Sequence, residues 1–139
     1  MRPSERREEK VPKRIVPVDG LIDAGQFGFS HCVVSGSHVY IAGQCGHGEG
    51  GAIPSDFAEQ CRLTLDAVRL AVEAAGGTLD DIVTMTVFVT DLEHYPVFSQ
   101  IRKEFFPENF PASAAVGVAG LVPPGAMIEI QATAVIGEA

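Results

Sequence analysis

Cysteine is scarce in this 139-residue sequence. The three cysteines are an odd number, and no two of them have the CxxC spacing that is typical of a zinc knuckle. Neither a disulfide framework nor a structural zinc site is therefore expected. We expect no metal ion and no cofactor.

Long apolar runs are also missing. Glycine and threonine interrupt every apolar segment well before it reaches the length needed to cross a bilayer. The first fourteen residues, MRPSERREEKVPKR, contain no apolar stretch of the kind found in a secretory signal. The sequence therefore predicts a cytoplasmic protein with no membrane partner.

Basic residues become rare after position 14. Six of the ten lysines and arginines lie within residues 1–14. The remainder contains fifteen acidic residues and only four basic ones, Arg62, Arg69, Arg102 and Lys103. An acidic body repels phosphate backbones, and nucleic-acid affinity rests mainly on neutralising phosphates. We therefore expect no nucleic-acid partner. The composition predicts a disordered charged tail over residues 1–14 and one domain over residues 15–139.

The remaining composition is that of a globular domain, with 46% hydrophobic and 20% charged residues. Alternating and β-rich patterns predict strands, whereas apolar residues at helical spacing, bounded by Asp56 and Gly76, predict a helix. The predicted elements, in order, are strands at 14–20, 26–36 and 38–44, a helix at 56–76, a strand at 79–92, a shorter helix at 93–106 and two strands within 111–135. This order predicts an α+β fold, a mixed sheet with both helices on one face.

Small side chains dominate the segment PASAAVGVAGLVPPGAMIEIQATAV near the end of the chain. On its last strand the period of two separates an apolar side from one that carries Glu129, Gln131 and Thr133. The preceding strand holds nothing larger than valine. A solvated face would carry larger polar side chains throughout. We therefore expect another chain to pack against this face.

Four segments resemble those of a known family in sequence, order and spacing: VYIAGQ, AAGGTLDDIVTMTVFVTDL, FFPENFPA and PPGAMIEIQATAV. From about Ile15 to Val135 the chain resembles the RidA (YjgF-type) family of enamine and imine deaminases. The resemblance implies a chorismate-mutase-like fold, a homotrimer, and active sites in the clefts between subunits. It agrees with the packing expected for the small-residue face.

The resemblance also identifies positions at which the chain departs from the family. Ser113 stands where the family has the arginine that grips the substrate carboxylate, and Ala115 where it has a cysteine. Phe29 replaces a tyrosine, and Ser99 replaces an asparagine. An arginine binds a carboxylate through two charge-assisted bonds, whereas Ser113 offers one neutral donor.

Two family positions are kept, Gly43 and Glu129, and the resemblance gives Glu129 the role of positioning the hydrolytic water. Taken alone, a carboxylate between two isoleucines is either a general base or a group bonded at a subunit interface. Cys45 and His47 flank a glycine just beyond a predicted strand. They form either a thiol–imidazole pair with an activated thiolate or part of a glycine-rich loop without chemistry.

The leading functional prediction is a RidA-like small-molecule hydrolase or deaminase that acts on an enamine or imine. The predicted catalytic residues are Glu129, Cys45 and His47, and the predicted substrate-binding residues are Phe29, Gly43, Ser99, Ser113 and Ala115. The missing arginine predicts reduced or no activity on simple 2-imino acids and favours a pathway-specific substrate such as a 2-aminomuconate-type compound. The alternative is a non-catalytic ligand-binding or chaperone-like trimer. The acidic body opposes the ribonuclease activity attributed to some relatives.

Overall fold

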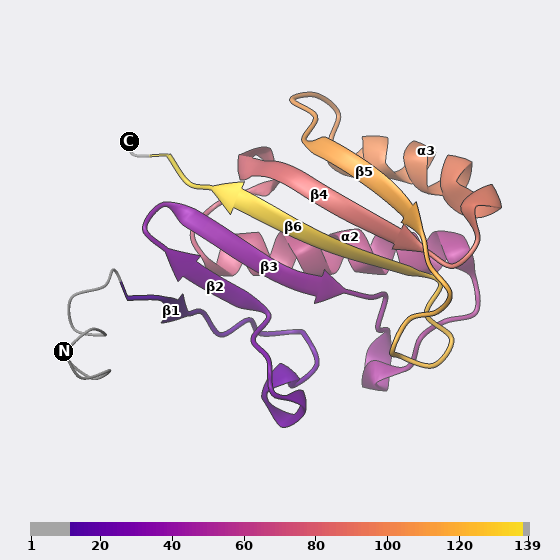
Figure 1. Cartoon of the computed structure of the whole chain (residues 1–139), viewed down its shortest axis with the longest axis horizontal. Coiled ribbons are helices and arrows are strands. Elements are labelled where there is room, and N and C mark those ends of the chain that lie inside the picture. Colours follow the sequence, from indigo (N-terminus) through magenta and orange to yellow (C-terminus); the bar gives the residue numbers. More distant parts are fainter. Residues whose placement is uncertain (1–11, 138–139) are drawn as a thin grey trace.

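A computed structural model describes residues 12–137 of the chain (Figure 1). The predicted order of strands and helices is confirmed. The elements are β1 (Arg14–Ile15), β2 (Cys32–Ser35), β3 (His38–Gln44), α2 (Phe57–Ala74), β4 (Ile82–Val89), α3 (Tyr95–Phe105), β5 (Ala112–Gly117) and β6 (Ile128–Val135), with short 3-10 turns η1 (Ala24–Phe27), η2 (Glu49–Gly51), η3 (Leu79–Asp81) and η4 (Leu92–His94).

The six strands form one mixed sheet in the order β1-β2-β3-β6-β4-β5. Within residues 12–137 only β4 and β5 pair in parallel, since α3 connects them, and every other pairing is antiparallel. Figure 1 looks onto the open face of the sheet, with α2 and α3 behind it. The predicted fold, a mixed sheet with two helices on one face, is therefore confirmed.

Helix α2 begins where the sequence predicts it. The Asp56 side chain accepts a hydrogen bond from the backbone N–H of Glu59 at 2.9 Å and so caps the first turn. At the other end Gly76 has φ +94°, a left-handed conformation that side chains rarely adopt and that ends the helix.

The core lies between α2, α3 and the covered face of the sheet. The apolar side of β6 is fully or almost fully buried, as its alternation predicts, and consists of Ile128, Ile130, Ala132 and Ala134. The side chains of Leu65, Val68 and Val72 on α2 have no exposed surface. Burying a side chain of this size stabilises the fold by about 1.5–3 kcal/mol.

One polar side chain is completely buried at the start of α2. Gln60 donates from Nε2 to the carbonyls of Pro54 at 2.7 Å and Gly125 at 3.0 Å. Its Oε1 accepts from the backbone N–H of Met127 at 2.8 Å. Gln60 therefore joins α2 to the segment that enters the helix and to the loop between β5 and β6.

Two sequence expectations change near the N-terminus. The strand expected at 26–36 begins only at Cys32. Gln26 and Phe27 belong instead to η1, because the Asp23 side chain accepts a hydrogen bond from the backbone N–H of Gly25 and Gly28 adopts φ +84°. Of the predicted tail, residues 1–11 lie outside the described part. Arg14 already pairs with Val34, so the sheet begins at the last residue of that tail.

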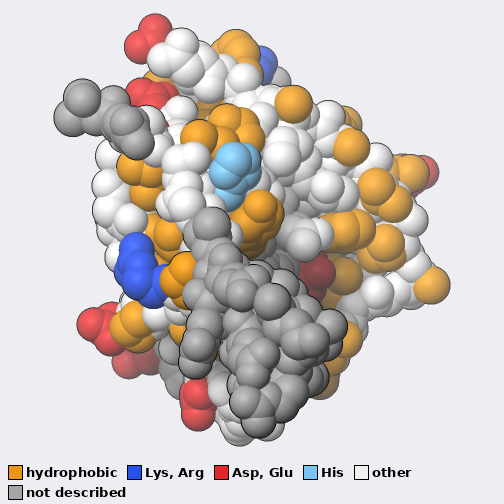
Figure 2. Space-filling model, turned by 60° about the vertical axis from the view of Figure 1, so that its left-hand side comes forward, with side chains coloured by type: hydrophobic (Ala, Val, Ile, Leu, Met, Phe, Trp, Pro, Cys, Tyr) orange, Lys and Arg blue, Asp and Glu red, His pale blue; other side chains and the backbone are white. Residues whose placement is uncertain are grey.

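The edge strand β5 is exposed along its whole length. Ser113, Ala115 and Gly117 lie on the helix side of the sheet because they pair with the buried residues of β4, and the other three side chains of β5 lie on the open face. The right-hand part of Figure 2 turns this open face towards the viewer and shows mainly hydrophobic and uncharged side chains. A long, small-residue edge of this kind is a template for contact with another chain.

Among residues 12–137, neither helix is both long and apolar enough to cross a membrane.

Candidate functional site

Glu129 lies on the open face of β6, against the end of β3. A Cβ built on Gly43 would lie 2.6 Å from Glu129 Oε2, so only glycine leaves room for the carboxylate at this position. The Cys45 thiol donates to Glu129 Oε1 at 3.5 Å. The structure therefore brings together three predicted site residues, Gly43, Cys45 and Glu129, which we call the carboxylate cluster.

The Cys45 thiol is held in its neutral form. Burial raises its pKa to about 12, and the neighbouring charge of Glu129 and the hydrogen bond to Glu129 act in the same direction. A nucleophilic thiolate needs a lowered pKa and a cationic neighbour. The arrangement therefore supports a hydrogen-bond donor that orients Glu129, and it gives no support to the activated thiolate.

Among the described residues, no hydrogen bond joins the His47 side chain to that thiol. His47 Nδ1 bonds to the carbonyl of Gly51 at 2.9 Å, within the glycine-rich loop. Both His47 and Cys45 line a cavity of about 460 Å³ between this loop, residues 20–22 and α2. The predicted thiol–imidazole pair is therefore not formed, and a catalytic role for His47 stays a prediction without a partner group.

Phe29 lies beyond η1, and its side chain is partly exposed. Its ring meets the ring of His31 edge-on, with 5.6 Å between the ring centroids. His31 is itself held between the carbonyl of Ile22 at 2.7 Å and the Gln44 side chain at 3.0 Å. These contacts link Phe29, through His31, to Gln44 at the end of β3.

A second set of predicted residues lies at the other side of the sheet. Ser99 on α3 and Ser113 on β5 line one pocket together with Arg102. Arg102 donates from Nη1 to Ser113 Oγ at 2.9 Å and from Nη2 to the Tyr95 hydroxyl at 2.9 Å. We call Ser99, Arg102 and Ser113 the arginine cluster. Ala115 follows Ser113 on the same side of β5.

The two clusters do not meet within one chain. Glu129 is on the open face of β6, whereas Ser113 is on the helix side of β5, two strands away. That separation is roughly 10 Å along the sheet in addition to its thickness. A small ligand therefore cannot contact both clusters of the same chain.

Arg102 is the site residue that reasoning from the sequence missed. Arg102 is on α3, whereas the family's substrate-binding arginine corresponds to a position on β5. The spacing of Tyr95, Ser99 and Arg102 is nevertheless i, i+4, i+7, which places all three on one face of a helix. That spacing is the signal that could have found it.

Comparison with known proteins gives consistent matches. The family model described as Endoribonuclease L-PSP matches residues 24–136. The "Putative reactive intermediate deaminase TdcF" of Escherichia coli K12 is 41% identical over 106 residues, which cover 72% of this chain and 80% of the relative. RutC family protein PH0854 of Pyrococcus horikoshii is 33% identical over 128 residues, 91% of this chain and 92% of that protein. The crystal structure of E. coli TdcF with bound serine has a TM-score of 0.79 and 35% identity, covering 89% of this chain and 99% of that one. The segment matched by the family model contains both clusters.

Proposed function

Since this chain belongs to the Endoribonuclease L-PSP family, we propose that it is a deaminase of enamines or imines whose active sites lie between the subunits of a homotrimer. The name of the relative that is 41% identical, a reactive intermediate deaminase, supports this activity. The surplus of acidic residues after position 14 favours a small molecule over RNA as the substrate.

The observation that carries the proposal is the way in which Glu129 is held. Its carboxylate lies on the sheet face opposite α2 and α3, packed against Gly43 and bonded to the Cys45 thiol. A glycine and a neutral thiol fix the position of the carboxylate without neutralising its charge. A positioned, charged carboxylate at an open surface is suited to accept a proton from a water molecule.

The reaction requires no cofactor. Water adds to the carbon of the C=N bond while Glu129 accepts one of its protons, and that proton is then passed to the nitrogen, which regenerates the carboxylate. The resulting carbinolamine then collapses to a carbonyl and releases ammonia, so that an imine and one water yield a carbonyl and one ammonia. An enamine enters the same sequence after its carbon is protonated to give the imine.

The assembly is supported by the exposure of β5. Every residue of this strand is exposed in the single chain, and none has a side chain larger than valine. A second copy of the chain packed here would cover the edge and bring its own carboxylate cluster towards the arginine cluster. We propose that this contact completes the site.

The proposed substrate is a pathway-specific enamine, such as a 2-aminomuconate-type compound, and simple 2-imino acids are expected to be poor substrates. Ser113 carries no charge, and the nearest guanidinium reaches it from α3. The positive charge of Arg102, which is carried by α3, therefore lies at a different place from that of an arginine on β5. Substrates whose carboxylate lies directly beside the C=N carbon are therefore expected to fit less well than longer ones.

Ammonia release from both substrate classes tests this function. We expect turnover of about 1 per second or faster on the 2-aminomuconate-type enamine, and slower or no turnover on 2-aminoacrylate-derived imines, each measured above its spontaneous hydrolysis. Rapid turnover of the simple imine would contradict the substrate preference. No acceleration with either substrate would favour the non-catalytic, ligand-binding trimer.

A further inference from the structure

A pocket of about 280 Å³ between α3 and β5 gathers positive charge in a protein that is otherwise acidic. Two of the four basic residues that follow position 14, Arg102 and Lys103, line it. The other lining residues are uncharged: Ser99, Phe106, Phe110, Pro111 and Ser113. The pocket is thus positive on an acidic molecule with a formal net charge of −8.

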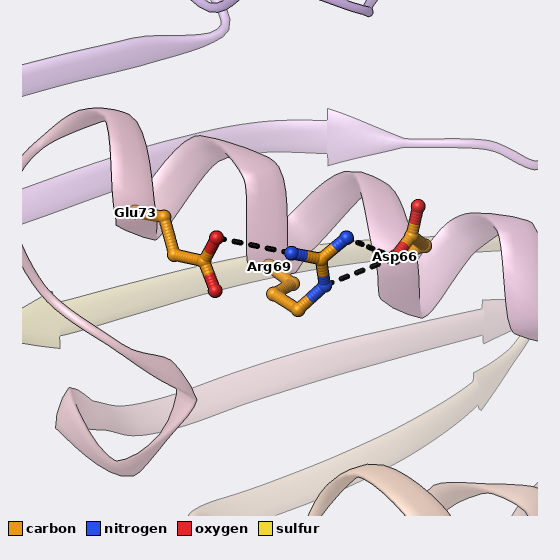
Figure 3. A network of polar contacts seen from close by, with 3 residues as sticks. All are labelled: Asp66, Arg69 and Glu73. Carbon is orange, nitrogen blue, oxygen red and sulfur yellow. Dashed lines mark hydrogen bonds and ion pairs between the residues drawn. The ribbon is translucent and has the colours of Figure 1, made fainter.

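The other two arginines of the domain are neutralised by carboxylates. Arg69 lies between Asp66 and Glu73 on α2, with Nη1 at 3.0 Å from Glu73 (Figure 3). Arg62 pairs with Glu104 at 3.2 Å. Within the part of the chain that the structure describes, no carboxylate pairs with Arg102. The two hydrogen bonds that its guanidinium donates there go to neutral oxygens.

The orientation of Arg102 is fixed by its neighbours. Hydrogen bonds to Ser113 Oγ and the Tyr95 hydroxyl, each 2.9 Å long, use two of the five N–H groups that a guanidinium carries. The guanidinium carbon lies 5.0 Å from the centroid of the buried Phe98 ring, within the range of a cation–π contact. A pre-oriented planar group with N–H groups left over is what a carboxylate needs for two parallel hydrogen bonds.

The walls of the pocket leave room for a ligand of limited size. Ser99 and Ser113 are small, and Phe106, Phe110 and Pro111 provide apolar surface. Phe110 is among the most exposed large apolar side chains of the described chain, at 69%. A ligand with a carboxylate at one end and an apolar carbon chain would cover this surface.

We propose that this pocket binds a carboxylate group of the substrate and that Arg102, reaching in from α3, is the residue that recognises it. The placement of this pocket at the active site rests on the proposed function. The recognition of a carboxylate rests on the pocket itself. Arg102 is then a specificity-determining residue, and neutral enamines are excluded from productive binding.

Binding, measured apart from turnover, tests the proposal. Calorimetric titration of the full-length protein uses cis,cis-muconate and 2-oxobutanoate as probes and 2-butanone as the neutral control. We expect both carboxylates to bind and 2-butanone to give no heat. Arg102→Met should weaken carboxylate binding at least tenfold, because a bidentate charged contact is lost. Lys103→Met, which removes a charge from the same pocket, should weaken it by less.

Arg102→Lys provides a second variant that keeps the charge but not the planar fork, and its affinity should lie between those of the wild type and Arg102→Met. Three results would overturn the proposal: equal affinity of the wild type and Arg102→Met, a larger loss of affinity in Lys103→Met than in Arg102→Met, or no carboxylate binding at millimolar concentration. The outcome is separable from that of the proposed function. Carboxylate binding that depends on Arg102, without any ammonia release, would leave the pocket assignment in place and reject the deaminase.

Discussion

Replacing Glu129 with glutamine should slow ammonia release by roughly 100-fold or more, because the amide retains the shape of the carboxylate but cannot accept a proton from water. The side chain remains packed against Gly43, so the fold and the assembly should be kept. The measurement is kcat on the preferred enamine, together with the mass of the assembly and the melting temperature.

Cys45→Ser is the matched comparison. The thiol bonds to the same carboxylate at 3.5 Å and has its pKa raised to about 12 by burial and by Glu129, so it should not act as a nucleophile. The serine hydroxyl still donates to Glu129, and we expect a loss of less than about tenfold. Equal, large losses in both variants would restore the nucleophilic thiol. Dissociation of Glu129→Gln would show that the carboxylate is structural.

Gln60→Leu should lower the free energy of unfolding by roughly 2–4 kcal/mol. The substitution removes three hydrogen bonds and leaves the carbonyls of Pro54 and Gly125 and the N–H of Met127 without their partner. Urea unfolding followed by circular dichroism measures the change. Gln100→Leu, at an exposed position of α3, is the control and should change stability by less than about 0.5 kcal/mol. Equal stability of the two variants would contradict the role assigned to Gln60.

The strands and helices were predictable because their patterns are local. Alternation identified the buried side of β6, and Asp56 marked the start of α2. The turn at 24–27 was missed because it depends on Asp23 and Gly28, whose effect on the backbone competes with the β-rich pattern around them.

The candidate site was predictable only in part. Glu129 and Gly43 were identified through a resemblance, and their contact appears only when β3 and β6 are paired. Arg102 was overlooked because its importance depends on a contact between a helix and a strand eleven residues later. Gln60 lies within the predicted helix, and its partners lie in loops that no local pattern connects to it.

We propose that each active site combines the carboxylate cluster of one chain with the arginine cluster of another. Mixing two impaired variants, Glu129→Gln and Arg102→Met, by co-expression in equal amounts tests it directly. In a cyclic trimer assembled at random, about a quarter of the inter-subunit sites receive an intact Glu129 and an intact Arg102 from different chains. We predict that the mixture regains about a quarter of the wild-type activity per site. Activity no higher than the average of the two separate variants would contradict a site shared between subunits.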